Sequence, residues 1–323
     1  MNRSEFWKNF ELGTEIDIAG SFIFNGLRRL HEMESLYHES EVFEFLYNLA
    51  VGIERLLKVA VILIEHDEVV DQEEFEQSLI THSHQDLVRR VREKHEFRLA
   101  SSDNEFLDLL GRFYRTHRYG RFAISAGSRS SEKKLLHKFV GKNLDIEIRD
   151  EFPLLITPND SQIRKFIGRR VAKITKRPYE IICEQASRLR LYTHELRSGS
   201  KAEKIFLREQ FDFCDEDVLW RELLLFILHS DVSTGMIGFM KSLEPLPFDP
   251  GLISEYLQCF ASEERKLQVL DELDHHYDDV ENVKLRLEKI SVIGASNVFF
   301  DDEEDDDEFD YELGEGPSQL DHP

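Results

Sequence analysis

The sequence has few of the residues on which extracellular, membrane or metal-binding proteins depend. Its three cysteines, Cys183, Cys214 and Cys259, are too scattered for a disulfide framework or a zinc site. Apolar runs such as Val59–Ile64 are far shorter than the roughly 20 residues that span a bilayer. The first ten residues, MNRSEFWKNF, lack the apolar core of a signal peptide. We therefore expect a reduced, cytoplasmic protein with no membrane segment.

Signatures of the common enzyme classes are also missing. The chain contains no P-loop, no GxGxxG after a strand pattern, no HExxH and no GxSxG. His82 and His84 are two residues apart, so on a helix their side chains diverge by about 200° and make a poor metal pair. The sequence therefore predicts neither a bound metal nor a cofactor.

Acidic residues dominate the charge. The 323 residues include 64 Asp and Glu but only 41 Lys and Arg, which gives a net charge of −23 at pH 7. Twelve of the acidic residues follow Phe300, in a segment with no Lys or Arg. Because such a run repels itself and offers little apolar surface, we expect a disordered acidic tail over residues 298–323. Two roles stay open for this tail: solubilisation, or competition for a basic surface in the same chain.

The densest positive charge lies between Arg164 and Arg177, where seven Lys and Arg side chains occur without an acid. Apolar residues at helical spacing predict a helix here, with one buried stripe and an outward cationic face. Cations concentrated in an acidic protein suggest contact with phosphate; ion pairs with neighbouring acids are the alternative. We expect Pro178 to break or kink this helix. The predicted RNA-binding residues are Arg164, Lys165, Arg169, Arg170 and Lys173.

Helical patterns run through most of the chain, and strand patterns are almost absent. We expect an all-α fold in which residues 1–150 form an N-terminal bundle of four or five helices. Residues 151–297 are expected to form a C-terminal helical region that includes the basic helix, and the acidic tail follows. Apolar residues of this second half recur at helical spacing and are expected to form a core: Trp220, Leu223, Leu224, Phe226, Ile227, Leu257, Phe260, Leu267 and Leu270. The longer predicted helices are 21–34, 41–65, 73–98, 105–121, 179–197, 201–211 and 215–229.

The predicted helix 41–65 is apolar over most of its circumference. A helix of this kind is usually surrounded by others, so we place it at the centre of the N-terminal bundle. Gly52 lies in its middle, where it costs about 1 kcal/mol relative to Ala. We therefore expect a close helix crossing at Gly52.

Three segments follow one another in a familiar order: GIERLLK (52–58), THSHQDLV (81–88) and GRFYRTHRYGRF (111–122). Over about residues 20–125 this order resembles the HEPN superfamily, whose domains are all-helical bundles. Arg112 and His117 match the Arg-x(4–6)-His motif of that family. The resemblance implies a homodimer in which Arg and His of both copies line one cleft. It also implies RNA cleavage without metal, leaving a 2′,3′-cyclic phosphate and a 5′-hydroxyl.

This reaction explains why Arg and His are needed. The ribose 2′-OH loses a proton, the phosphorane charge is neutralised, and the 5′ oxygen gains a proton. Imidazole moves protons near neutral pH, and guanidinium holds phosphate oxygens. The resemblance thus makes His117 a general acid or base and Arg112 a phosphate clamp. Five residues turn an ideal α-helix by about 140°, so a helix end, a distortion or a dimer must bring the two together.

Spacing alone gives other matches, namely Arg89 and Arg90 with His95, and Arg188 with His194. Three functions remain open. The first is a HEPN-type endoribonuclease, in a bacterial toxin–antitoxin or phage-defence system. The second is a non-catalytic HEPN-like module that binds nucleic acid or a partner protein. The third is an acidic scaffold whose tail occupies a basic site on another protein.

Overall fold

The chain forms two compact units, residues 1–213 and 214–323, and helices are the main secondary structure of both. The computed structural model describes residues 2–67, 69, 71–118, 122, 131–149, 156–295, 298–300 and 311–313. The predicted all-α class is confirmed. The described strands are β1 (Val298–Phe300) and β2 (Tyr311–Leu313), which pair antiparallel; most of the predicted acidic tail lies outside the described residues.

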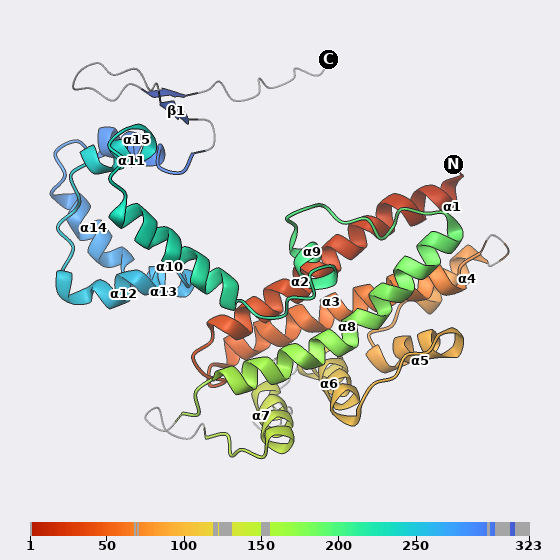
Figure 1. Ribbon diagram of the computed structural model, residues 1–323. Helices are drawn as coiled ribbons and strands as arrows, with labels where there is room; N and C mark the ends of the chain where they lie inside the picture. Colours follow the sequence, from red (N-terminus) through yellow and green to blue (C-terminus); the bar gives the residue numbers. More distant parts are fainter. Residues whose placement is uncertain are drawn as a thin grey trace. The chain divides into compact units, whose positions relative to one another are not determined.

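The first unit begins with a nearly continuous helical segment: α1 (Arg3–Phe6), the π-helical turn η1 (Trp7–Glu11) and α2 (Leu12–Glu32). The long α3 (Glu39–Glu65) and α8 (Ser161–Leu189) lie alongside α2 (Figure 1). Shorter helices complete the unit: α4 (Gln72–Ser78), α5 (His84–Lys94), α6 (Ser101–Arg112), the π-helical turn η2 (Phe113–His117), α7 (Glu132–Leu144) and α9 (Lys201–Phe206).

Helix α3 is the centre of this bundle, as its apolar circumference predicts. It packs against α2, α5, α6, α7 and α8. Its buried residues face every direction, and Phe45, Leu49, Ile53, Leu56 and Ala60 are completely inaccessible to solvent. Each large apolar side chain buried in this way stabilises the fold by about 1.5–3 kcal/mol. Packing of α3 therefore holds the other helices of the unit together.

Helices α2 and α3 cross in close contact at Gly52, as expected. A Cβ atom at position 52 would lie 2.7 Å from Ile23 Cγ1 and 2.9 Å from the carbonyl oxygen of Ala19. The second of these atoms belongs to the backbone of α2, so it cannot rotate away. Glycine at position 52 thus permits the crossing of the two helices.

The predicted boundary near residue 150 is wrong, because the basic helix α8 belongs to the first unit. Its apolar stripe, which includes Ile163, Ile167 and Val171, is buried in the same core as α3. The segment before α8 is also tied to the bundle. Asn159 Nδ2 donates hydrogen bonds to the carbonyl oxygens of Leu30, at 2.6 Å, and Met33, at 3.0 Å, where α2 ends.

Some predicted helix ends are also wrong. α8 is not interrupted at Pro178, because the flanking residues Ile174, Tyr179 and Ile182 are buried and their packing offsets the roughly 3 kcal/mol cost of an internal proline. The predicted helix 73–98 is divided into α4 and α5, and the predicted helix 105–121 becomes α6 followed by η2.

The second unit consists of shorter helices: α10 (Cys214–His229), α11 (Gly235–Ser242), the 3₁₀ turn η6 (Pro250–Leu252), α12 (Ile253–Gln258), α13 (Glu263–Leu267), α14 (Leu270–Asp278) and α15 (Val283–Ser291). The prediction of a core here is wrong. Leu223, Phe226, Phe260 and Leu267 are 50–67% exposed, since helices of five to nine residues cannot cover α10. In the part of the chain that the structure describes, no helix is both long enough and apolar enough to cross a membrane.

We predict that Gly52→Ala destabilises the first unit, although alanine favours helix formation. The added methyl group collides with the backbone of α2, and overpacking of this kind costs about 1–3 kcal/mol. Gly13→Ala is the matched control, because its Cβ would meet nothing closer than the Thr193 carbonyl oxygen at 3.7 Å. Urea unfolding, monitored by circular dichroism, compares the free energies of unfolding of the two variants with that of the parent. A Gly52→Ala protein as stable as the parent would contradict the crossing.

Candidate functional site

The three segments that resemble the HEPN motifs meet around Glu54 of α3. This carboxylate is only 7% exposed, and Lys58 Nζ donates a hydrogen bond to it at 2.7 Å. His82, from the segment before α5, places Nδ1 3.1 Å from Glu54 Oε2. The turn η2 adds Tyr114, whose ring centroid lies 4.9 Å from that of His82. The guanidinium of Arg118, just after η2, lies 4.1 Å from the centroid of the Tyr114 ring.

These five residues, Glu54, Lys58, His82, Tyr114 and Arg118, are called the Glu54 cluster below. A carboxylate as buried as that of Glu54 requires partners, because removal from water costs an ion several kcal/mol. Lys58 and His82 supply them. The side chain of His82 is 48% exposed, so it combines an anchored Nδ1 with access to solvent. A histidine oriented by a carboxylate in this way can transfer protons through Nε2.

Tyr114 is a neutral hydrogen-bonding group in this cluster. Partial burial raises the pKa of its phenol above the ordinary value of 10.0, and the nearby carboxylate of Glu54 also raises it. The cation of Arg118 acts in the opposite direction. The phenol therefore stays protonated at neutral pH, where it can donate a hydrogen bond to an anionic ligand.

His84 has a structural role. It is completely buried, and its Nε2 lies 2.8 Å from the carbonyl oxygen of Ala50, so it joins the start of α5 to α3. Burial lowers the pKa of the imidazole below 6.5 more than its hydrogen bond and Glu54 raise it. The ring is therefore neutral at pH 7 and donates its Nε2–H to Ala50.

The turn η2 changes the relation between Arg112 and His117. Its last hydrogen bond runs from the backbone N–H of Arg118 to the carbonyl oxygen of Phe113, at 3.0 Å, which spans five residues. In a turn of this kind, positions five apart lie closer together around the helix axis than the roughly 140° of an α-helix. Residue 117 is the last of the turn, and Arg112 immediately precedes it. The backbone thus contains the distortion that the Arg-x4-His spacing requires.

Arg112 itself is on the surface. Its side chain is 55% exposed, and Nη1 lies 3.7 Å from Asp108 Oδ2. An exposed ion pair of this length is weak and gives way to a stronger anion such as phosphate. The side chain of His117 lies outside the described part of the structure.

Two of the competing residues serve packing. Arg90 makes a two-pronged ion pair with Glu65, at 3.0 and 2.6 Å, and its side chain is only 16% exposed. The His95 side chain is 17% exposed, and its Nε2 lies 3.0 Å from Gln185 Nε2. Neither residue is available for a ligand without breaking these contacts. This favours Arg112 over the match of Arg90 with His95.

The predicted RNA-binding residues of α8 divide into two groups. Lys165, Arg169 and Lys173 are exposed and have no hydrogen-bond or ion-pair partner among the described residues. They follow one another at intervals of four residues, so they form one line of positive charge about 12 Å long. We call this line the α8 stripe.

Arg164 and Arg170 instead make contacts within the protein. Arg164 Nη1 donates to the carbonyl oxygen of His31 at 3.3 Å. Arg170 Nη1 lies 3.0 Å from Oδ1 of Asp103, a residue that is only 3% exposed. Arg170, a predicted RNA-binding residue, is thus engaged within the protein, because α6 covers this side of α8 and presents a buried carboxylate to it.

A groove beside the α8 stripe extends the positive surface. It has a volume of about 390 Å³ and lies between α8 and the segment after α5, with Arg98, Lys173, Lys176 and Arg177 among its lining residues. Three of these cations are paired with carboxylates: Arg98 with Glu96, at 2.5 Å, Lys176 with Glu209, at 2.7 Å, and Arg177 with Glu184, at 2.6 Å. Among the described residues Lys173 has no such partner, so it is the lining cation left open to a ligand at the end of the stripe.

Sequence reasoning missed the pairing of Glu54 with His82. Both residues lie inside the segments that carry the family resemblance, 52–58 and 81–88, but their spacing gives no sign that they meet. Among the described residues, no group of His, Cys, Asp and Glu side chains is placed to hold a metal ion. The chain matches no family model, no curated protein and no solved structure.

We predict that His84 makes the stability of the first unit depend on pH. Because its pKa is lower in the folded protein, the unfolded chain binds a proton more readily. The contribution of the neutral His84 ring to the free energy of unfolding is present above pH 6.5. It is lost as the pH falls below this value, by about 1 kcal/mol between pH 6.5 and 5.5.

Urea unfolding from pH 5 to 8 measures the effect in His84→Gln, which removes the titrating group. We expect a flatter pH dependence in this variant than in the parent. His38→Gln removes an exposed histidine and should retain the dependence of the parent. Equal slopes for the parent and His84→Gln would exclude this role of His84.

Proposed function

We propose that this chain is a metal-independent endoribonuclease of HEPN type, acting in the cytoplasm as a homodimer. The observation that carries the proposal is the meeting of the three motif-like segments at the Glu54 cluster, next to a π-helical turn that directly follows Arg112 and ends at residue 117 of the Arg-x4-His motif. π-Helical turns cost stability and often occur at functional sites. A setting in bacterial toxin–antitoxin or phage-defence systems accords with the family resemblance.

The proposed reaction uses the side chains in separate roles. Arg112 exchanges its weak pair with Asp108 for the scissile phosphate and neutralises the charge of the phosphorane. His117 transfers one proton. His82, oriented by Glu54, is the group we propose for the second proton transfer, because removal of the 2′-OH proton and protonation of the 5′ oxygen need a base and an acid.

The α8 stripe is the proposed binding surface for the RNA backbone. Arg170 joins α8 to Asp103 in the first turn of α6, and Arg112 ends the same helix nine residues later, about 14 Å away along its axis. A single RNA strand of a few nucleotides on the stripe could reach Arg112. Cations that have no protein partner lose little when they bind phosphates, and the counterions released there favour binding.

A non-catalytic HEPN-like module that binds RNA or a partner protein is the second candidate. The pair of Arg112 with Asp108 favours it, because a clamp already neutralised by a carboxylate is weaker. The two candidates share the α8 stripe and differ in whether bound RNA is cut.

We predict that the purified protein cuts RNA in the presence of EDTA and leaves 2′,3′-cyclic phosphate ends. His117→Ala and His82→Gln should each lower the rate by about 10²–10⁴, as expected for loss of general acid–base catalysis. Arg112→Ala should lower it by about 10²–10³ through loss of charge stabilisation. Gel analysis of labelled RNA with end-group identification measures both rate and product.

Arg89→Ala is the matched control for Arg112→Ala. Arg89 is also exposed and also forms weak helix-surface pairs, with Asp86 at 3.5 Å and Glu93 at 3.4 Å, and it belongs to a competing spacing match. The Arg89→Ala protein should cut RNA at the parental rate. Cleavage that EDTA abolishes, or that survives in His117→Ala, rules out the proposed reaction, whereas binding without any cleavage favours the second candidate.

We predict that Arg169→Glu combined with Lys173→Glu weakens RNA binding at least tenfold at 50 mM salt. This double substitution reverses two charges of the α8 stripe and breaks no ion pair among the described residues. Lys138→Glu with Lys284→Glu makes the same change in net charge on exposed residues of α7 and α15. Fluorescence anisotropy with a labelled single-stranded RNA compares the affinity of the two double variants. Equal weakening of RNA binding in both would show that net charge alone controls binding.

A further inference from the structure

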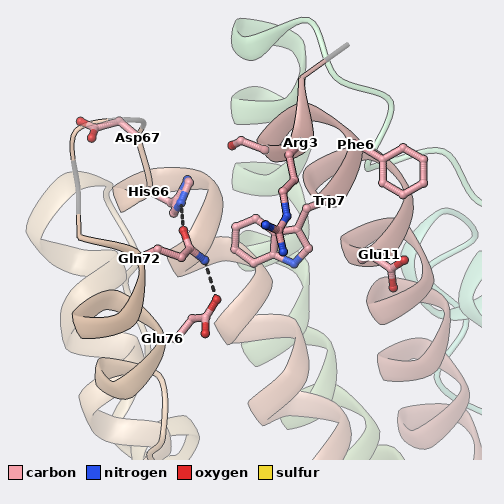
Figure 2. Close-up of a pocket in the computed structure, with 9 residues that line it drawn as sticks. Arg3, Phe6, Trp7, Glu11, His66, Asp67, Gln72 and Glu76 are labelled. Atoms are coloured by element: carbon pink, nitrogen blue, oxygen red, sulfur yellow. Dashed lines mark hydrogen bonds between the residues drawn. The ribbon is translucent and has the colours of Figure 1, made fainter.

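A pocket of about 580 Å³ lies at the end of α3, where α1 and η1 face α4 (Figure 2). Trp7 and Glu11 belong to the N-terminal wall, and His66, Gln72 and Glu76 belong to the opposite wall. The volume is within the usual range for sites that bind small molecules. The pocket contains none of the residues assigned above to RNA.

A chain of hydrogen bonds crosses the second wall, and its direction is fixed by chemistry. Gln72 Nε2 donates to Glu76 Oε1 at 2.6 Å, because a carboxylate can only accept. Gln72 Oε1 is therefore the acceptor for His66 Nε2, at 2.7 Å, and that nitrogen carries the proton. In the neutral ring, Nδ1 is consequently an acceptor.

No group of the described residues donates a hydrogen bond to this acceptor. His66 is only 8% exposed, and its Nδ1 is buried without a hydrogen-bond partner. A buried acceptor left unfilled costs about 1–3 kcal/mol. The backbone of His66 is also fixed, because Lys8 Nζ donates to its carbonyl oxygen at 2.9 Å. A ligand that brings an N–H donor into the pocket offsets this cost.

The charges that line the pocket also favour a ligand that carries hydrogen-bond donors and positive charge. The described residues that line it include three carboxylates, those of Glu11, Asp67 and Glu76, and one Arg or Lys cation, Arg3. Within the described residues, Glu11 and Glu76 have no cationic partner. The excess of negative charge therefore favours a cation and opposes an anion.

The aromatic residues of the pocket indicate an organic cation. Trp7 and Phe6 both line it, and the Trp7 ring lies 5.1 Å from His66 in an edge-on arrangement. The face of an indole attracts cations, and its apolar area favours a ligand with a hydrocarbon body. The described residues do not group here as metal ligands do, so a bare metal ion is less suitable.

We propose that this pocket binds a small organic cation with N–H donors, of the amine or amidine class. Glu76 and Glu11 balance its charge, His66 Nδ1 accepts one of its N–H groups, and its apolar body packs on Trp7. The bound cation contacts both the N-terminal segment and α4. It thereby adds to the contacts of Trp7 and Lys8 with His66, which connect the N-terminal segment to the end of α3.

Three probes of one shape and different charge test the proposal: benzamidine, benzamide and benzoate. The full chain with Trp220→Phe retains Trp7 as its single tryptophan, so indole fluorescence reports directly on the pocket. We expect benzamidine to bind saturably. Benzamide, which is neutral, and benzoate, which is anionic, should bind at least tenfold more weakly.

Substitutions in the same background assign the site. Glu76→Gln and Glu11→Gln, on opposite walls, should each weaken benzamidine binding about tenfold by removing one charged partner. Glu73→Gln is the control, since Glu73 is an exposed acid of α4 that does not line the pocket. Thermal unfolding verifies that each variant is folded. Equal affinity for the three probes, no saturable binding of benzamidine, or parental affinity in both wall variants would overturn the proposal.

Discussion

Burial of α3 is the constraint on which the first unit depends. Because other helices cover it on nearly all sides, each charged group on α3 must find its partner inside the bundle or at its edge. Glu41 and Glu54 are both 7% exposed, and they pair with Arg29 and with Lys58 and His82. Glu65, near the end of the helix, holds Arg90 of α5. The positions of α2, α5 and the segment before α5 are therefore set by electrostatics as well as by apolar packing.

The same constraint positions the candidate site. Glu54 holds His82 in place, His82 contacts Tyr114, and Tyr114 belongs to the turn that follows Arg112 and ends at residue 117. Phe113, in the same turn, is fully buried and packs edge-on against Phe43 of α3, with ring centroids 5.2 Å apart. Burial of Phe113 resists unwinding of η2, so the cost of the π-helical turn is offset by packing.

Periodicity in the sequence predicts which face of a helix is buried, but not what covers it. It correctly gives α3, its central position and the role of Gly52, because these depend on residues within one helix and on backbone volume. It misses the place of α8, because the hydrogen bonds of Asn159 to the end of α2 join residues more than a hundred positions apart. It also does not show that the helices of the second unit leave apolar residues of α10 exposed.

The candidate site shows the same limit. Lys165, Arg169 and Lys173 recur every four residues, and this spacing alone places them on one line. Arg170 lies about 100° from Arg169 around the helix, yet its burial could be recognised only from Asp103 on α6. The pairing of Glu54 with His82 and the turn η2 likewise arise from tertiary packing. For these features the residues were visible in the sequence, whereas their geometry was not.

A net charge of −23 does not prevent a chain from binding RNA on the α8 stripe. At 0.15 M salt the Debye length is about 8 Å, so exposed charges beyond this distance are largely screened. The stripe is longer than this, and its three cations have no carboxylate partner within the described residues. A phosphate on the stripe is therefore attracted mainly by those cations. At low salt the acidic remainder acts over longer distances and opposes the approach of RNA. The affinity thus depends on two opposing effects, short-range attraction and long-range repulsion, both of which salt weakens.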